Sequence, residues 1–238
     1  MGSLPGGSAV TVHVVGTAER VVETIEAAGH PVRTAVPADV VEENPSVVVT
    51  VGERALLAVA RERPAVPILP VDTDIGPGSA DRRAILAALA GDATEHTHPI
   101  LSVSIDGEST ASAFMDVTLV TTEPARISEY AVDHADERVA AFRADGVVVA
   151  TPAGSHGYAA AAGGPTLAPT AEALCVVPIA PFHTQATRWV LDTSALGLSV
   201  LRDEGEVSLL VDDTEYGVVD PDQRVRLAVD GHVRTLRL

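Results

Sequence analysis

The segment Asp145–Pro165 combines residue types that let a backbone come close to a ligand. It reads Asp-Gly-Val-Val-Val-Ala-Thr-Pro-Ala-Gly-Ser-His-Gly-Tyr, followed by four alanines and Gly-Gly-Pro. An apolar strand therefore leads through a glycine-rich turn into a short helix of small residues. Glycine and alanine leave room, and a helix N-terminus offers free N–H groups to an anion or a polar group. The segment predicts either a ligand site or a tight strand-to-helix turn without a ligand.

Two other groups of residues suggest different chemistry. Ser155, Asp192 and His232 follow the chain order serine, acid, histidine of a hydrolase, but alanine stands two positions before the serine, where that motif has glycine. His96 and His98 have the spacing of two ligands on one strand face, yet no third ligand is near them in sequence. We therefore keep the hydrolase as a minor alternative and interpret the two histidines as surface residues.

The elements that must position the glycine-rich segment fall into two kinds. From Val10 to about Gly91, apolar runs alternate with helical periodicity. Unbroken β-branched runs between helices indicate strands buried on both faces, which is typical of a parallel α/β layer. The strands are expected at Val10–Val15, Val47–Val51 and Val66–Val71, and the helices at Ala18–Ala28, Arg54–Arg63 and Asp81–Ala90.

After His98 the pattern changes to short strands with turn residues between them, which indicates an all-β sandwich or barrel. We therefore predict an α/β + β chain, with a Rossmann-like domain at residues 1–98 and a β-rich domain at residues 99–238. The strands of the second domain are expected at Ile100–Ile105, Ala113–Val120, Arg126–Val132, Gly146–Ala150, Leu174–Val177, Val207–Val211, Val225–Val229 and Val233–Leu238.

The charged residues exclude several classes of function. All 16 cationic residues are arginine, so the chain has no lysine. A phosphate-binding loop that ends in Gly-Lys-Ser/Thr, a Schiff-base mechanism and a lysine general base are excluded, because each needs an ammonium group at a fixed point. The net charge of −17 also argues against nucleic acid as a partner, since a polyanion binder needs a basic surface.

Excess carboxylate and the absence of lysine favour a cytoplasm of very high salt, where screening makes a charged surface tolerable. An acidic protein from a GC-rich genome, which prefers arginine codons, is the alternative.

The single cysteine, Cys175, leaves no internal disulfide and no cysteine cluster for zinc. No apolar run is long enough to span a bilayer and the first residues do not form a signal peptide, so we expect a cytoplasmic protein without membrane contact.

The ordered motifs in the second half resemble those of the NAD kinase family. In that family a strand carrying Asp-Gly runs into Thr-Pro-x-Gly-Ser-Thr-Ala-Tyr, then Ala-Gly-Gly-Pro, then Pro-Ile-x-Pro-His. Here the matching stretches are Asp145–Tyr158, Ala162–Pro165 and Pro178–Pro181. The resemblance implies the fold of NAD kinases, with an α/β domain followed by a β-rich domain and a nucleotide site. It also implies a homodimer or homotetramer.

The family places Gly-Gly-Asp-Gly-Thr after its third core strand, where the glycines lie against the ATP phosphates and the aspartate faces the acceptor hydroxyl. The corresponding residues here are Gly52, Glu53 and Arg54. The resemblance assigns Glu53 as the catalytic residue, with Gly52 and Arg54 at the phosphates. Glu53 adds a methylene, and a displacement of about 1 Å can cost on the order of 10²-fold in a positioned reaction. A solvated Glu–Arg pair at a helix start is the alternative.

Other family positions differ in chemistry. The dipeptide Asn-Glu or Asn-Asp, which holds the NAD nucleotide, appears as Met115-Asp116, and the Asn of a later loop appears as Asp72, ahead of Gly76 and Gly78. His156 replaces a threonine of the family turn, and Pro-His becomes Pro-Phe with His183 one place later. Asp212-Asp213 lies at a family Asp-Gly turn and is interpreted as a hairpin turn.

The resemblance implies transfer of the ATP γ-phosphoryl group to the adenosine 2′-hydroxyl of NAD, with Mg²⁺ on the phosphates and no assigned metal ligand from the protein. Asp116 and Asp145 would hold the ribose and nicotinamide end of NAD. The alternative is a non-catalytic NAD(P)-binding homologue that has lost phosphoryl transfer. The remaining nucleotide-binding residues that the resemblance implies are Thr151, Gly154, Ser155, His156 and Tyr158.

Overall fold

The computed structural model describes residues 10–75, 78, 81–123, 126–182 and 188–238. The chain divides into two compact units, residues 1–98 with 232–238 and residues 99–231. None of the described helices has the length and apolar content that a membrane crossing requires.

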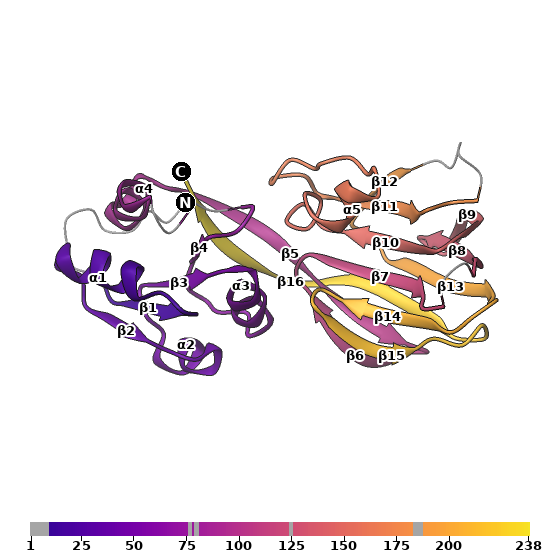
Figure 1. Ribbon diagram of the computed structural model, residues 1–238, viewed down its shortest axis with the longest axis horizontal. Helices are drawn as coiled ribbons and strands as arrows, with labels where there is room; N and C mark the ends of the chain where they lie inside the picture. Colours follow the sequence, from indigo (N-terminus) through magenta and orange to yellow (C-terminus); the bar gives the residue numbers. More distant parts are fainter. Residues whose placement is uncertain (1–9, 76–77, 79–80, 124–125, 183–187) are drawn as a thin grey trace. The chain divides into compact units, whose positions relative to one another are not determined.

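The first unit is a parallel α/β layer, as the sequence predicts (Figure 1). Strand β1 pairs in parallel with β2 on one side and with β3 on the other, and β3 pairs with β4. The elements are β1 (Val12–Val15), α1 (Glu19–Ala27), β2 (Val32–Thr34), α2 (Pro37–Glu43), β3 (Val47–Val51), α3 (Glu53–Arg61), β4 (Ile68–Val71), α4 (Arg82–Ala87) and the π-helical turn η1 (Ala88–Asp92).

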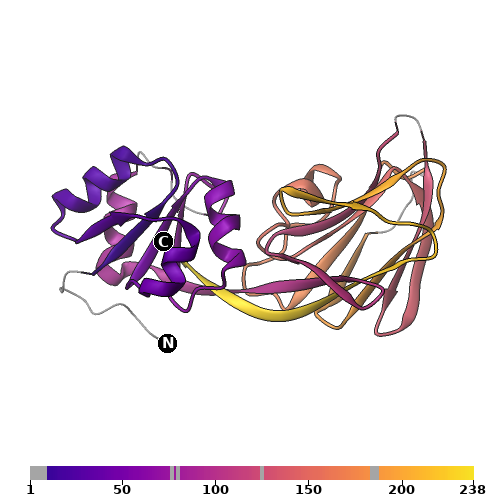
Figure 2. The same cartoon turned by 90° about the horizontal axis from the view of Figure 1, so that it is seen from below.

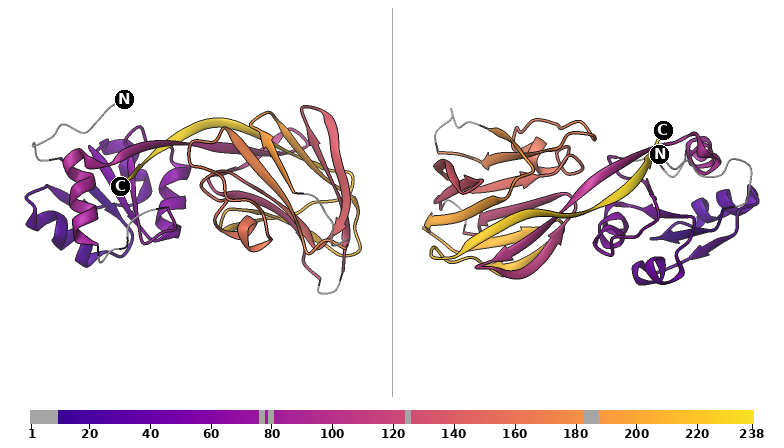
Figure 3. Two further views of the ribbon diagram at one scale, coloured as in Figure 1. Left: turned by 90° about the horizontal axis from the view of Figure 1, so that it is seen from above. Right: turned by 180° about the vertical axis from the view of Figure 1, so that it is seen from behind.

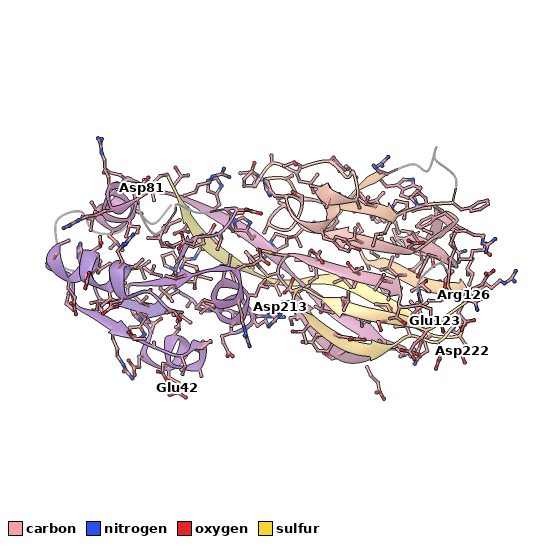
Figure 4. All side chains as sticks on the ribbon, in the orientation of Figure 1. Glu42, Asp81, Glu123, Arg126, Asp213 and Asp222 are labelled. Atoms are coloured by element: carbon pink, nitrogen blue, oxygen red, sulfur yellow. The ribbon has the colours of Figure 1, made fainter. Side chains whose placement is uncertain are left out.

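Valine-rich strands form the centre of this layer because both of their faces are covered. Val47, Val48 and Val49 are fully buried. One core joins α1 and α4 to the sheet through Ile25 and Ile85, while α2 and α3 pack together (Figure 2). The starts of two helices are set by the residue that precedes them. Gly52 precedes α3. The Asp81 carboxylate, labelled in Figure 4, caps α4 by accepting the Ala84 N–H at 2.9 Å.

The second unit is a β-sandwich, in agreement with the predicted β-rich domain. Its elements are β5 (Thr94–Ile105), β6 (Glu108–Ala113), β7 (Asp116–Thr121), β8 (Ser128–His134), β9 (Glu137–Ala144), β10 (Gly146–Ala150), α5 (Tyr158–Ala161), β11 (Ala173–Ile179), β12 (Trp189–Asp192), β13 (Leu196–Arg202), β14 (Val207–Val211), β15 (Thr214–Val218) and β16 (Arg224–Arg237). One sheet has the order β12-β11-β10-β7-β14-β15, and the facing strands are β16-β13-β8-β9 with β5 and β6.

Side chains from both sheets fill one apolar core. Leu119 and Val149 come from the six-stranded sheet, and Val132 and Leu198 from the facing strands. All four are fully buried. Strand β10 is buried along its whole length, because Val148 and Ala150 on its other face pack with Ala159 of α5.

The prediction of separate strands at Val225–Val229 and Val233–Leu238 is wrong, because β16 is continuous from Arg224 to Arg237. Asp230 and Gly231 read as a turn in the sequence, yet Gly231 adopts a φ of +142° within the strand, which glycine tolerates. The two long strands β5 and β16 pair with each other, as Figure 3 shows, and each contributes residues to both units.

Candidate functional site

In the first unit, the loops after β1, β3 and β4 share one edge of the sheet, because these strands are parallel. The chain leaves β1 toward β2 and reaches β3 on the opposite side, so the strand order reverses between β1 and β3. In open α/β sheets, ligands bind outside the carboxyl ends of the strands at such a reversal. The residues at that point are Gly16, after β1, and Gly52, after β3.

Gly16 brings these two loops into close contact. Its φ is +107°, and a Cβ atom at this position would lie 2.6 Å from the Val51 carbonyl oxygen and 3.2 Å from the Ala55 Cβ. Only glycine fits such an approach. Sequence reasoning missed Gly16, although a glycine directly after the first buried strand was a signal that could have found it.

Gly52 allows the chain to turn from β3 into α3. Its φ is +84°, and its N–H donates to the Val71 carbonyl at 2.9 Å, which ties the β3 and β4 ends together. The side chains of Glu53 and Arg54 are exposed in the first turn of α3, which has no side-chain N-cap. Backbone N–H groups at a helix start and a guanidinium group together can hold an anion. The predicted trio is thus contiguous and accessible.

In the second unit, the turn after β10 holds the start of β7. The Thr151 Oγ1 hydroxyl donates to the Phe114 carbonyl at 2.7 Å, and the Thr151 N–H donates to the Met115 carbonyl at 2.9 Å. Gly154 lies so close that a Cβ there would be 2.2 Å from the Met115 oxygen. Asp116 therefore begins β7 directly after residues whose backbone is held by hydrogen bonds, and its side chain is partly exposed.

The hairpin turn between β14 and β15 holds the same segment from its other side. The Asp212 carboxylate accepts the N–H groups of Phe114 at 3.0 Å, Met115 at 2.7 Å and Asp116 at 3.1 Å. In return, the Asp212 N–H donates to the Asp116 carbonyl at 2.9 Å. The interpretation of Asp212-Asp213 as a hairpin turn is confirmed. The three hydrogen bonds that the Asp212 carboxylate accepts from backbone amides were not predicted from the sequence.

Ser155 is buried, and its hydroxyl has two backbone partners. It donates to the Pro152 carbonyl at 2.9 Å and accepts the Leu167 N–H at 2.9 Å. Asp192 pairs with His134 at 3.0 Å. The hydrolase alternative is therefore wrong: the serine hydroxyl stabilises a turn, and the acid partners another histidine.

The exposed half of the turn begins at His156. Its Nδ1 atom is buried with no hydrogen-bond partner among the described residues, and the Tyr158 side chain is 43% exposed. Burial raises the pKa of the Tyr158 phenol above its usual range, and the nearby negative charges of Asp116 and Asp145 add to this increase. The exposed Tyr158 phenol is thus a polar group that a ligand can contact, whereas the partly exposed His156 keeps its Nδ1 atom buried.

Asp116 and Asp145 lie at opposite ends of one strand pair. Asp116 pairs with Ala150, the last residue of β10, whereas Asp145 directly precedes Gly146, the first. Five strand steps of roughly 3.3 Å separate the two positions by about 17 Å. The two carboxylates therefore cannot contact one small chemical group within one chain.

No cluster of three or more His, Cys, Asp or Glu side chains suitable for a metal ion occurs among the described residues. The His98 Nε2 lies 2.8 Å from the Thr235 Oγ1 in the interior of the first unit. The interpretation of His98 as a surface residue is wrong, because its side chain is buried. Gly76, Pro77 and His183 lie outside the described residues.

Sequence comparison relates both halves of the chain to known proteins. Residues 115–234 match the family model of the ATP-NAD kinase C-terminal domain. A NAD kinase of Symbiobacterium thermophilum is 32% identical over an alignment covering 90% of this chain and 85% of that protein. A NAD kinase of Methanosarcina acetivorans is 35% identical over 53% of this chain and 46% of that protein. The aligned part thus spans about half the length of the Methanosarcina protein.

Structural comparison shows the same fold in two solved structures. A NAD kinase from Archaeoglobus fulgidus in complex with ATP has a TM-score of 0.74 at 20% identity, covering 95% of this chain and 93% of that one. Yeast NADH kinase complexed with NADH has a TM-score of 0.78 at 16% identity, covering 98% and 84%.

Proposed function

This chain belongs to the NAD kinase family, and we propose that it transfers the γ-phosphoryl group of ATP to the adenosine 2′-hydroxyl of NAD, giving NADP. The observation that carries the proposal is the fixed segment Met115-Asp116. Thr151 holds it on one side and Asp212 on the other, so an acidic side chain stands at the start of β7. A preorganised carboxylate is suited to hold the hydroxyl groups of a ribose.

Phosphoryl transfer needs positioning and charge neutralisation more than covalent chemistry. In our proposal Gly52 and the first turn of α3 receive the ATP phosphates, and the Arg54 guanidinium neutralises part of their charge. Glu53 orients the acceptor hydroxyl and takes its proton. Mg²⁺ would enter on the phosphates of the ATP substrate and neutralise part of their charge.

NAD would lie against the second unit, with Asp116 and Asp145 at its ribose and nicotinamide end. The exposed Tyr158 and the partly exposed His156 would line its path, and Ser155 holds the turn beneath them.

The activity test measures NADP formed from NAD and ATP with Mg²⁺ in molar KCl, with NADH and polyphosphate as alternative substrates. Glu53→Gln should lower kcat by about 10² to 10⁴, the range expected for loss of a general base. Glu62→Gln, at the other end of α3 and also exposed, removes the same charge and should leave kcat unchanged. If the wild-type chain binds NAD but forms no NADP, it is a binding homologue and the kinase proposal is wrong.

We also propose that the protein works in a cytoplasm of high salt. The net charge of −17 and the lack of lysine support this, because counterions at high salt screen the repulsion between closely spaced carboxylates. The urea midpoint should rise with KCl concentration up to the molar range. Equal stability at 0.1 M and 3 M KCl would contradict this proposal.

The quaternary structure that we propose is a homodimer or homotetramer. The edge strand β12 supports association, because its apolar Val190 side chain is 54% exposed and an edge strand offers unpaired backbone groups. Native mass spectrometry in volatile salt gives the subunit number, and a monomer at micromolar concentration would refute this assignment.

A further inference from the structure

Asp212 has an unusual relation to the nucleotide-binding segment. Its two carboxylate oxygens accept three consecutive backbone N–H groups, from Phe114 to Asp116, at distances of 2.7 to 3.1 Å. The residue sits at the tip of the β14–β15 hairpin with a φ of +52°, next to Asp213, which Figure 4 labels. A carboxylate that accepts several amide hydrogens makes stronger bonds than a neutral acceptor.

Together with Thr151, this carboxylate leaves the segment without backbone freedom. The N–H groups of Phe114, Met115 and Asp116 bind Asp212, and the Asp116 carbonyl accepts the Asp212 N–H. The Phe114 and Met115 carbonyls bind Thr151. Three N–H groups and three C=O groups are thus all paired, through partners that lie on two separate loops.

We propose that Asp212 is a positioning residue for the nucleotide site, which acts by fixing the backbone from which the Asp116 carboxylate projects. This inference rests on the proposed function, because it treats Asp116 as a contact of NAD. Asp212 need not touch the nucleotide itself. Its effect on NAD should therefore pass entirely through Asp116.

Asp212→Asn is the informative change, because asparagine also tolerates the left-handed backbone. The side chain loses its charge and one acceptor oxygen, so an NH₂ group faces one of the three amides, donor against donor. A matched control exists at the β5–β6 turn. Asp106 has a φ of +51°, accepts the Arg224 N–H at 2.9 Å and donates its own N–H to the Arg224 carbonyl at 3.0 Å. Asp106→Asn therefore tests the same loss at a turn that holds a single amide.

Calorimetry with NAD on a double-mutant cycle tests the inference. Asp212→Asn should raise the Kd for NAD by about 10- to 100-fold, as expected for a displaced contact, whereas Asp106→Asn should not. In an Asp116→Ala background, Asp212→Asn should have no further effect, because residues acting through one contact are coupled. If the two factors multiply, Asp212 does not act through Asp116 and the inference is wrong.

Amide-resolved hydrogen exchange provides a second measurement that does not depend on NAD. Asp212→Asn should speed exchange at Phe114, Met115 and Asp116, while Asp106→Asn should speed it at Arg224 alone. If Asp212→Asn does not fold, Asp212→Glu keeps the charge but moves the carboxylate, and it should still weaken NAD binding and speed exchange. Unchanged exchange at Phe114–Asp116 in the folded variant would overturn the inference. If the wild-type chain does not bind NAD, the proposed function fails, and the exchange measurement alone decides whether Asp212 fixes the segment.

Discussion

Lowering the pH from 7 to 5 should destabilise the first unit through a single histidine. His98 is buried, and its Nε2 lies 2.8 Å from Thr235 Oγ1. Burial lowers the pKa of His98 from 6.5 to about 4, and the positive charges of His96 and Arg237 contribute in the same direction. As the pH falls, the unfolded chain therefore binds the proton first. The stability from the neutral side chain is fully present above pH 6.5 and is lost as the pH falls toward 4.

The size of this effect follows from proton linkage. With a pKa of about 4 in the folded chain and about 6.5 in the unfolded chain, the free energy of unfolding falls by roughly 2 kcal/mol between pH 7 and pH 5. The complete shift corresponds to about 3 kcal/mol, because one pKa unit is worth about 1.4 kcal/mol. This loss is a large fraction of the stability of an ordinary domain.

The assay is urea unfolding at constant KCl and at pH 7, 6 and 5, on the wild type and on His98→Gln. Glutamine can keep a hydrogen bond to Thr235 but does not titrate, so the variant should lose roughly 2 kcal/mol less than the wild type over this range. His232→Gln changes an exposed histidine of the same unit and should follow the wild type. The reasoning is refuted if His98→Gln and the wild type lose stability equally between pH 7 and 5.

Three further changes test the close contacts. Gly16→Ala should destabilise the first unit by more than about 1 kcal/mol in urea unfolding, because its Cβ would meet the Val51 oxygen at 2.6 Å. Gly29 also has a positive φ but has open space around it, so Gly29→Ala is the control and should destabilise the unit less. Gly154→Ala should lower the melting temperature and weaken NAD binding in calorimetry, and an unchanged melting temperature would contradict the contact. Ser155→Ala should cost about 1–3 kcal/mol in urea unfolding, because the buried Leu167 N–H loses its acceptor.

The buried strands could be predicted from the sequence because their composition leaves few alternatives. The runs at Val47–Val51, Gly146–Ala150 and Val207–Val211 form strands with these bounds. Strand β9, Glu137–Ala144, was not predicted, because it begins with two charged residues and is mostly exposed or half-buried at the edge of its sheet. An edge strand needs no continuous apolar run, so its sequence resembles that of a loop.

The parts of the candidate site that depend on neighbouring residues could be predicted from the sequence, whereas the parts that depend on partners far along the chain could not. Gly52 and the turn from Thr151 stand out because glycine and proline mark backbone conformation directly. The Asp212 carboxylate, in contrast, binds amides that lie 96 to 98 positions earlier in the chain. Each hairpin has an aspartate at the same place in the turn, although Asp106 holds one amide and Asp212 holds three. Only the fold distinguishes the two.

Because His232–Leu238 belongs to the first unit, this unit cannot finish folding until the end of the chain has been synthesised. These residues complete the first unit, yet they follow the whole of residues 99–231. At 5–20 residues per second, a ribosome needs about 7 to 27 s to make residues 99–231. During that time strand β4 lacks its neighbour β16, so its backbone edge stays open to pairing with other nascent chains. Early association with a chaperone, or rapid folding of the second unit, would shorten this exposure during translation.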